Sequence, residues 1–427
     1  MSPSYRRKGA VLGSVLAGFV GQAALALSGP LTARMLGVTG RGQLALVFLF
    51  IAITSLLGGL GLPTAVTFLL AKSQTTAAGA LWRFRRHWFL LCVSASLGCT
   101  SAILLYQALT GALHGIIVPT LLLSFPAVGL SMTLQLAIGC LQGEMRFSAL
   151  SVLRVLPAAL TAGAVTVVYL TNLTRSVPVL LSLSVGASFI SSLLSIIIIF
   201  RPKSPALKGG ALRLEGRQLA RYGLRALLGA SSPIDSLSLD QAFVGLLLSP
   251  RLLGLYVVAG AFANLPTLVL QSVGLLALPR VAAIGDATLQ RQALNRVILA
   301  SAILSAIVCV VVESVLQPFL LFAFGRPFLA ALPIGRVLVA GGFFLGMRRL
   351  LTTLLQAVNR PGRASFGEAL GVGALIVTLA PGVALLQDIG AALAISFSGF
   401  VTATYMIVAL RKVDAEEPFL RDYKELT

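Results

Sequence analysis

Long apolar runs separated by short polar stretches cover almost the whole chain. Each run has about the 20 residues that an α-helix needs to cross the hydrocarbon core of a bilayer. The pattern predicts twelve membrane-spanning helices, at 9–33, 43–70, 87–109, 115–141, 148–170, 177–200, 222–248, 252–279, 293–316, 328–357, 365–387 and 389–410. The expected fold class is therefore all-α, a polytopic membrane protein, because helices satisfy their own backbone in lipid.

The longest polar interruption is Arg201–Arg225, which holds seven Lys or Arg and one Glu. A stretch with this much charge cannot lie in hydrocarbon, so we expect a cytoplasmic connector between two six-helix lobes. The expected domains are an N-terminal lobe (1–200), a basic connector (201–221), a C-terminal lobe (222–412) and a cytoplasmic tail (413–427).

The composition excludes a water-soluble globular protein. Hydrophobic residues make up 57% of the chain, charged residues only 11%, and the mean hydropathy is +0.96. The net charge of +20 comes from 33 Lys and Arg against 13 Asp and Glu. These cations fall in loops between apolar runs, so the positive-inside rule explains them better than nucleic-acid binding does, and no nucleic-acid partner is expected.

The distribution of the cations over the loops predicts the orientation. With a cytoplasmic N-terminus, 27 of the 33 Lys and Arg lie inside. The six on the outer side are Arg34, Arg41, Arg175, Arg251, Arg326 and Arg336. We therefore expect a multi-pass protein of the cytoplasmic (inner) membrane with both termini in the cytoplasm.

Three short matches indicate that the second half repeats the first. They have offsets of 217, 216 and 214 residues and pair Arg34–Gly37 with Arg251–Gly254, Leu62-Pro63 with Leu278-Pro279, and Leu141-Gln142 with Leu355-Gln356. Because each half has an even number of crossings, the lobes are expected to be related by a pseudo-two-fold axis along the membrane normal. Substrate sites in such folds lie between the repeats.

The chain carries no recognisable catalytic constellation. Its two histidines, His87 and His114, lie far apart in the predicted topology, and there is no phosphate-binding loop motif or pair of carboxylates in a cytoplasmic domain. The four cysteines lie in apolar segments and are interpreted as small hydrophobic residues. We expect neither an enzyme nor a metal site or cofactor, apart from a coupling ion, H⁺ or Na⁺.

Three stretches resemble one transporter family: Gly29–Lys72, Asp240–Ala283 and Phe324–Phe343. They are similar to the polysaccharide-export, or O-antigen-type, flippases of the multidrug/oligosaccharidyl-lipid/polysaccharide (MOP) exporter superfamily. The resemblance implies a flippase for polyprenyl-diphosphate-linked oligosaccharide, with membrane lipids and polysaccharide polymerase or export machinery as further partners. Twelve helices rather than the fourteen of lipid II flippases argue against lipid II as the substrate.

Two carboxylates are the candidate ion-coupling groups. Asp235 and Asp240 fall in the predicted helix 222–248, where a charge costs about 2.5–3.5 kcal/mol on insertion scales. One of them could titrate or bind Na⁺ during transport, and the resemblance favours Asp240. The alternative is a carboxylate neutralised by a neighbouring arginine for structural reasons alone.

Four arginines and two glutamines are the candidate substrate-binding residues. Arg34 and Arg251 are expected to end their helices, where Gly37 or Gly254 supplies the cap, and to meet phosphate at the outer side or simply to snorkel to it. Arg154 and Arg348 are the inner diphosphate candidates, because guanidinium binds phosphate in a bidentate manner. Their alternative role is again snorkelling.

The remaining polar residues in the helices allow two interpretations each. Gln142 and Gln356 could bind sugar hydroxyls or join helix to helix. Glu144 and Arg146 form a predicted interfacial ion pair. Glu313 and Glu368 are candidate gating partners. The sequence predicts no contact for either of them.

Two other functions stay open from the sequence. A cation or drug antiporter of the same superfamily would need a cavity rich in carboxylates, which the low acid count disfavours. A membrane scaffold that does not transport could recruit partners through Arg201–Arg225 or the tail Asp414–Thr427. The leading hypothesis is a flippase that works by alternating access between its lobes.

Overall fold

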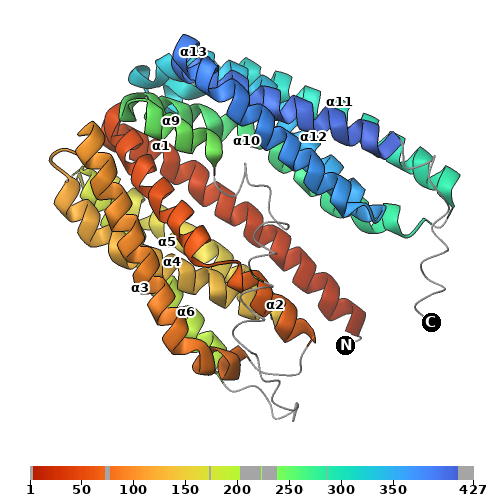
Figure 1. Cartoon of the computed structure of the whole chain (residues 1–427), viewed down its shortest axis with the longest axis horizontal. Helices are drawn as coiled ribbons and strands as arrows, with labels where there is room; N and C mark the ends of the chain where they lie inside the picture. The colour runs from red at the N-terminus through yellow and green to blue at the C-terminus, as the bar shows by residue number, and fades with distance from the viewer. Residues whose placement is uncertain are drawn as a thin grey trace. The chain divides into compact units, whose positions relative to one another are not determined.

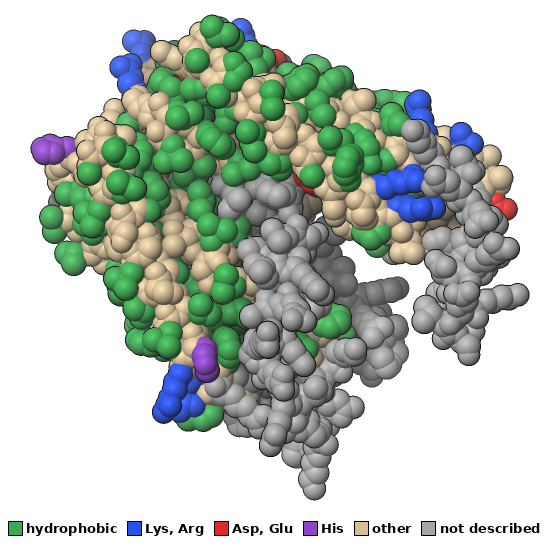
Figure 2. Space-filling view, viewed as in Figure 1, with side chains coloured by type: hydrophobic (Ala, Val, Ile, Leu, Met, Phe, Trp, Pro, Cys, Tyr) green, Lys and Arg blue, Asp and Glu red, His purple; other side chains and the backbone are tan. Residues whose placement is uncertain are grey.

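A computed structural model describes residues 3–72, 77–172, 175–201, 223, 238–284 and 286–411. Within these ranges every regular element is a helix (Figure 1). Nine of the described helices are long and apolar enough to cross a membrane, and large apolar side chains cover much of the surface in Figure 2. The protein is therefore an all-α, multi-pass membrane protein, which confirms the predicted fold class.

The described residues form two compact units, one up to Gly254 and the other from Leu255 onward. The first unit holds α1 (Pro3–Gly58), α2 (Leu62–Lys72), α3 (Ala77–Thr110), α4 (Ile117–Gly143), α5 (Phe147–Leu170), α6 (Val177–Phe200), α9 (Leu239–Leu247) and the first turn of α10 (Pro250–Ala282). In this unit α1 packs along α5, and α4 packs against α2, α3 and α6.

The first two predicted spans differ from the observed helices. The predicted loop 34–42 contains the break of α1 at Gly37, whose φ of 66° is left-handed, but the residues on either side of Gly37 are helical. The predicted span 43–70 is wrong as a single helix, because Leu60 and Gly61 have φ of 48° and 66° and separate α1 from α2. Several glycines weaken the helix here, and Pro63 fits the first turn of α2, where its missing N–H leaves no bond unmade.

The second unit holds the rest of α10, then α11 (Ala287–Phe319), the π-helical turn η1 (Leu320–Phe324), the 3₁₀ turn η2 (Arg326–Ala331), α12 (Leu332–Ala357) and α13 (Pro361–Arg411). The break in α13 at Gln387, with φ of 51°, separates two helices that match the predicted spans 365–387 and 389–410. They fold back on each other, since Ser398 Oγ donates to the Gly371 carbonyl at 2.7 Å.

Glycines allow helix backbones to approach closely in the first unit. A Cβ at Gly139 of α4 would lie 2.5 Å from the carbonyl oxygen of Pro63 in α2. The Thr67 hydroxyl donates to the Gly139 carbonyl at 2.9 Å and adds a polar contact at the same crossing. Small residues at helix crossings are typical of membrane bundles, where close packing replaces the hydrophobic effect as the driving force.

The turns after α4 (141–146) and after α12 (355–360) have the same geometry. In each, an arginine N–H bonds to the leucine carbonyl five residues earlier, at 2.9 and 2.8 Å, and the preceding N–H bonds to the glutamine carbonyl, at 3.1 Å in both. The residue before the arginine is left-handed in each, with φ of 55° at Met145 and 56° at Asn359. This Schellman-type helix end supports the predicted duplication through Leu141-Gln142 and Leu355-Gln356.

The other two predicted repeat matches are wrong in local structure. Gly37 breaks α1, whereas Gly254 lies inside α10 and caps no helix. A Cβ at Gly254 would lie 2.2 Å from the Val38 carbonyl oxygen, so close packing explains this glycine. Leu62-Pro63 begins α2, whereas Leu278-Pro279 lies within the last two turns of α10.

Part of the predicted domain organisation falls outside the described residues. This holds for 202–222, for most of the predicted helix 222–248 and for the tail from 412. The two compact units divide within α10, whereas the predicted lobes divide at the connector. The domain limits stay a prediction.

Candidate functional site

Arg348 is the largest fully buried side chain of the described residues, with no exposed surface. It lies in the second half of α12, on the face that also buries Gly341, Leu351 and Leu355. These residues are spaced by three, four and seven positions, so one side of the helix carries them all toward the core. Arg348 therefore sits among apolar side chains rather than at a helix end.

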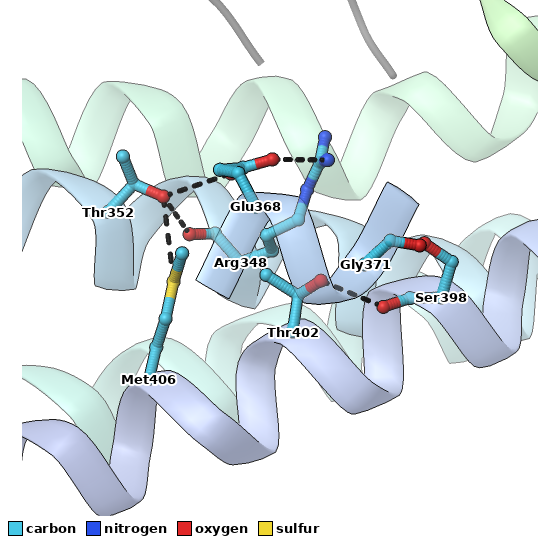
Figure 3. Close-up of polar contacts among 7 residues, drawn as sticks. All are labelled: Arg348, Thr352, Glu368, Gly371, Ser398, Thr402 and Met406. Carbon is cyan, nitrogen blue, oxygen red and sulfur yellow. Dashed lines mark hydrogen bonds and ion pairs between the residues drawn. The ribbon is translucent and has the colours of Figure 1, made fainter. Parts of the chain in front are cut away.

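The partner of Arg348 is a carboxylate on the next helix. Arg348 Nη1 lies 3.0 Å from Oε2 of Glu368 in α13, close enough for a charge-assisted hydrogen bond. Glu368 is itself buried, with 9% of its surface exposed. The ion pair joins α12 to α13 in the interior of the second unit (Figure 3).

Thr352, one turn further along α12, contacts both members of the pair. Its hydroxyl lies 2.9 Å from the Arg348 carbonyl oxygen and 3.3 Å from Oε1 of Glu368. The Met406 sulfur, from the second half of α13, lies 3.6 Å from the same hydroxyl. Both oxygens of the Glu368 carboxylate therefore have a polar neighbour, one an arginine and the other a threonine.

Small residues hold the two halves of α13 tightly beside this pair. Gly371 lies three residues beyond Glu368, and a Cβ there would meet the Thr402 hydroxyl at 2.1 Å. Thr402 in turn donates to the Ser398 carbonyl at 2.9 Å (Figure 3). The first half of α13, which carries Glu368, is therefore held by contacts with the second half of α13 as well as by the ion pair with Arg348.

A buried ion pair is electrically neutral as a whole, but removing one of its two charges costs free energy. Removing one partner leaves an uncompensated buried charge, which costs about 3–5 kcal/mol in measured cases. The guanidinium and the carboxylate therefore each need an opposite charge beside them as long as they are buried.

Two further acids singled out in the sequence, Glu313 and Glu144, form ion pairs with arginines. Glu313 lies 3.0 Å from Arg336 Nε, joining α11 to α12 at an exposed position. The predicted pair of Glu144 and Arg146 is confirmed, at 3.6 Å, and Glu144 also accepts the Ala77 N–H at 2.9 Å.

The remaining predicted site residues are placed as follows. Arg34 in α1, Arg154 in α5 and Arg251 in the first turn of α10 are exposed. Arg251 therefore begins a helix, and the prediction that it ends one is wrong. Their substrate-binding role stays a prediction.

The predicted glutamines and aspartates do not gather around the buried pair of Arg348 and Glu368. Gln142 and Gln356 have exposed side chains one residue before the ends of α4 and α12. Asp240 is half-buried in the first turn of α9, and Asp235 lies outside the described residues. Within the second unit, Arg348 and Gln356 are about 12 Å apart along α12, from eight residues at 1.5 Å each. Gln356 is therefore not part of the buried pair.

Sequence reasoning missed the geometry of the site and the role of Thr352. Thr352 follows Arg348 by one helical turn, and a hydroxyl at that spacing is the one available signal. The sequence indicated Glu368 as a candidate gating partner and did not predict its ion pair with Arg348.

Comparison with known proteins identifies the family and the fold. A family model described as polysaccharide biosynthesis protein matches residues 31–333. No curated protein matches the chain significantly.

Solved structures of several transporters resemble the whole chain. The inward-facing conformation of a multidrug resistance MATE family transporter of the MOP superfamily has a TM-score of 0.72 at 14% identity, covering 94% of this chain and 98% of the other. The lipid II flippase MurJ, in an inward closed conformation, has a TM-score of 0.73 at 15% identity, covering 94% and 87%. A MOP superfamily transporter from Pyrococcus furiosus has a TM-score of 0.56 at 14% identity, covering 95% of both chains.

These likenesses extend over nearly all of the chain, and the family model covers well over half of it. The fold and family predicted from Gly29–Lys72, Asp240–Ala283 and Phe324–Phe343 are confirmed. The chain belongs to the polysaccharide biosynthesis protein family and has the fold of MOP superfamily transporters.

Proposed function

We propose that this protein is a flippase that moves a polyprenyl-diphosphate-linked oligosaccharide from the inner to the outer leaflet of the cytoplasmic membrane. The observation that carries the proposal is membership in a polysaccharide biosynthesis family together with a transporter fold. The same fold occurs in a lipid II flippase, which handles a lipid-linked substrate. The low count of 13 Asp and Glu disfavours a cationic drug, which would need a cavity rich in carboxylates.

On this proposal Arg348 is the cation that receives the diphosphate. A phosphate oxygen accepts the same N–H groups as the Glu368 carboxylate, and guanidinium carries five such donors in a fixed fork. Substrate binding would then exchange one anion for another at the guanidinium, and Glu368 would take up a proton so that it is not left as an uncompensated buried charge. Thr352 would keep Glu368 hydrogen-bonded while the arginine turns to the substrate.

Transport on this proposal proceeds by alternating access and is driven by H⁺ or Na⁺. Asp240, half-buried at the start of α9, is the proposed coupling carboxylate, with Asp235 as the second candidate. Arg34, Arg154 and Arg251 would guide the diphosphate near the membrane faces, and both termini would lie in the cytoplasm. Polysaccharide polymerase or export machinery would receive the product.

Purified protein in liposomes tests the proposal. A fluorescent polyprenyl-diphosphate oligosaccharide is incorporated into the liposomes. The fraction of this lipid that a membrane-impermeant reductant can reach is followed with time. A cationic dye is assayed in parallel vesicles. The proposal predicts that the lipid changes leaflet faster than in protein-free vesicles and that the dye does not accumulate. Dye transport without lipid movement would indicate an antiporter, and no movement of either would favour a scaffold. Both results contradict the proposal.

A further inference from the structure

The start of α3 combines arginines, tryptophan and histidine at one edge of a membrane span. Trp82 is 60% exposed, and Arg85, Arg86 and His87 are also exposed. The apolar part of α3 that can cross a membrane begins at Phe84. These side chains therefore lie at the level of the lipid head groups, where tryptophan and arginine are typically found.

The arginines share a helix face with lipid-facing apolar residues. Trp82, Arg85, Arg86 and Phe89 are spaced by three, four and seven residues, which places them on one side of α3. Phe89 is 66% exposed, and the same face continues with the exposed Leu97. A lipid whose acyl chain lies on Phe89 would thus have its phosphate beside the two arginines.

The aromatic residues hold this cationic face in place. The Arg85 guanidinium lies 4.1 Å from the centre of the Trp82 ring, and its Nη1 donates to the Trp82 carbonyl at 2.7 Å. The His87 ring stacks on Phe84 with ring centres 5.5 Å apart. Figure 2 shows basic side chains gathered beside a histidine at the lower end of α3.

We propose that Trp82, Arg85 and Arg86 form a binding site for the phosphate of an anionic membrane lipid on the lipid-facing side of α3. Phosphatidylglycerol-type head groups fit it, since they bring one negative charge to two guanidinium groups. Each arginine near the membrane surface is expected to enrich the anionic lipid about fivefold. This site is separate from the Arg348 pair and stands whether or not the protein is a flippase.

The chain's own tryptophans provide the test, because it contains two and one of them, Trp82, belongs to this site. A Trp88→Phe variant in bilayers of fixed composition leaves Trp82 as the only indole. Its fluorescence is compared when either the phosphatidylglycerol or the phosphatidylcholine carries bromine, a quencher, near the head-group end of its chains. We expect the brominated anionic lipid to quench several-fold more effectively, and 0.5 M salt to reduce the difference through screening.

The control uses two charge-matched variants in the same background. Arg85→Gln with Arg86→Gln should remove the preference, whereas Arg280→Gln with Arg296→Gln, at two exposed positions in α10 and α11, should leave it unchanged. Equal quenching by both lipids in the protein with all its arginines would overturn the proposal. So would a preference that persists without Arg85 and Arg86. The effect of salt on the quenching of Trp88→Phe, which keeps all its arginines, tests the proposal even where Arg85→Gln with Arg86→Gln fails to fold.

Discussion

Replacing Arg348 by methionine would leave the Glu368 carboxylate buried beside an apolar side chain. In the structure Arg348 has no exposed surface and lies 3.0 Å from that carboxylate. Breaking a buried ion pair in this way should lower the free energy of unfolding by about 3–5 kcal/mol. For a unit of this size that corresponds to a melting temperature lower by about 6–20 °C.

The assay follows unfolding in detergent with a dye that becomes fluorescent on reaction with thiols. The described residues include four free cysteines, and Cys309 of α11 lies in the same unit as the pair. Arg348→Met with Glu368→Gln removes both charges and keeps an acceptor for Thr352. This double variant should melt within a few degrees of the wild type, because replacing both partners is often nearly neutral.

The exposed pair of Arg336 and Glu313 supplies the matched control. Its side chains are 58% and 39% exposed, so Arg336→Met should cost less than about 1 kcal/mol. If Arg348→Met melts no lower than Arg336→Met, or if the double variant is as unstable as the single one, the buried pair does not hold α12 to α13 as described.

Three further predictions concern other parts of the chain. Gly139→Ala should lower the melting temperature because the added methyl meets the backbone of α2, whereas Gly163→Ala, with open space around its Cβ, should not; equal effects would contradict this packing. Asp286 caps α11, and hydrogen bonds from the side chain and N–H of Thr288 and from the next N–H lower its pKa. Its contribution is therefore present above the unfolded pKa of about 3.9 and lost as the pH falls through the lower folded value. Asp286→Ala should speed hydrogen exchange at the start of α11 at neutral pH, and unchanged exchange would exclude the cap. Tyr106→Phe removes the 2.7 Å hydrogen bond to a carbonyl of α9 and should cost about 1–3 kcal/mol, measured by the same thermal assay; an unchanged melting temperature would show that this bond is not needed.

Hydropathy predicted the membrane helices well where their ends coincide with changes in polarity. The span 177–200 matches α6 (Val177–Phe200), and the predicted boundary near 388 matches the break at Gln387. The break in α1 at Gly37 falls within the predicted boundary 34–42, whereas the break before α2 was missed because it falls inside apolar sequence. There the backbone turns to meet neighbouring helices, and an apolar residue such as Leu60 adopts φ of 48° without any polar signal.

The candidate site was predictable only in part. Arg348 stood out as a cation deep in a helix, but the same reasoning gave equal weight to Arg154, which is exposed. Whether such an arginine is buried or exposed depends on which face of its helix is covered by neighbouring helices, and tertiary packing decides this. The pairing with Glu368 depends on the rotation of α12 and α13 about their axes, which hydropathy does not encode.

The most direct test of the central claim is the translocation rate of a diphosphate-linked oligosaccharide lipid in liposomes containing the double variant Arg348→Met with Glu368→Gln. This variant is expected to stay folded, so a loss of transport reports the role of the guanidinium in handling the substrate rather than its structural role. The account predicts that the wild type moves the lipid and that the folded double variant does so at least tenfold more slowly, since a charge-assisted hydrogen bond contributes about 1.5–3 kcal/mol. Translocation at the wild-type rate by the folded double variant would contradict it.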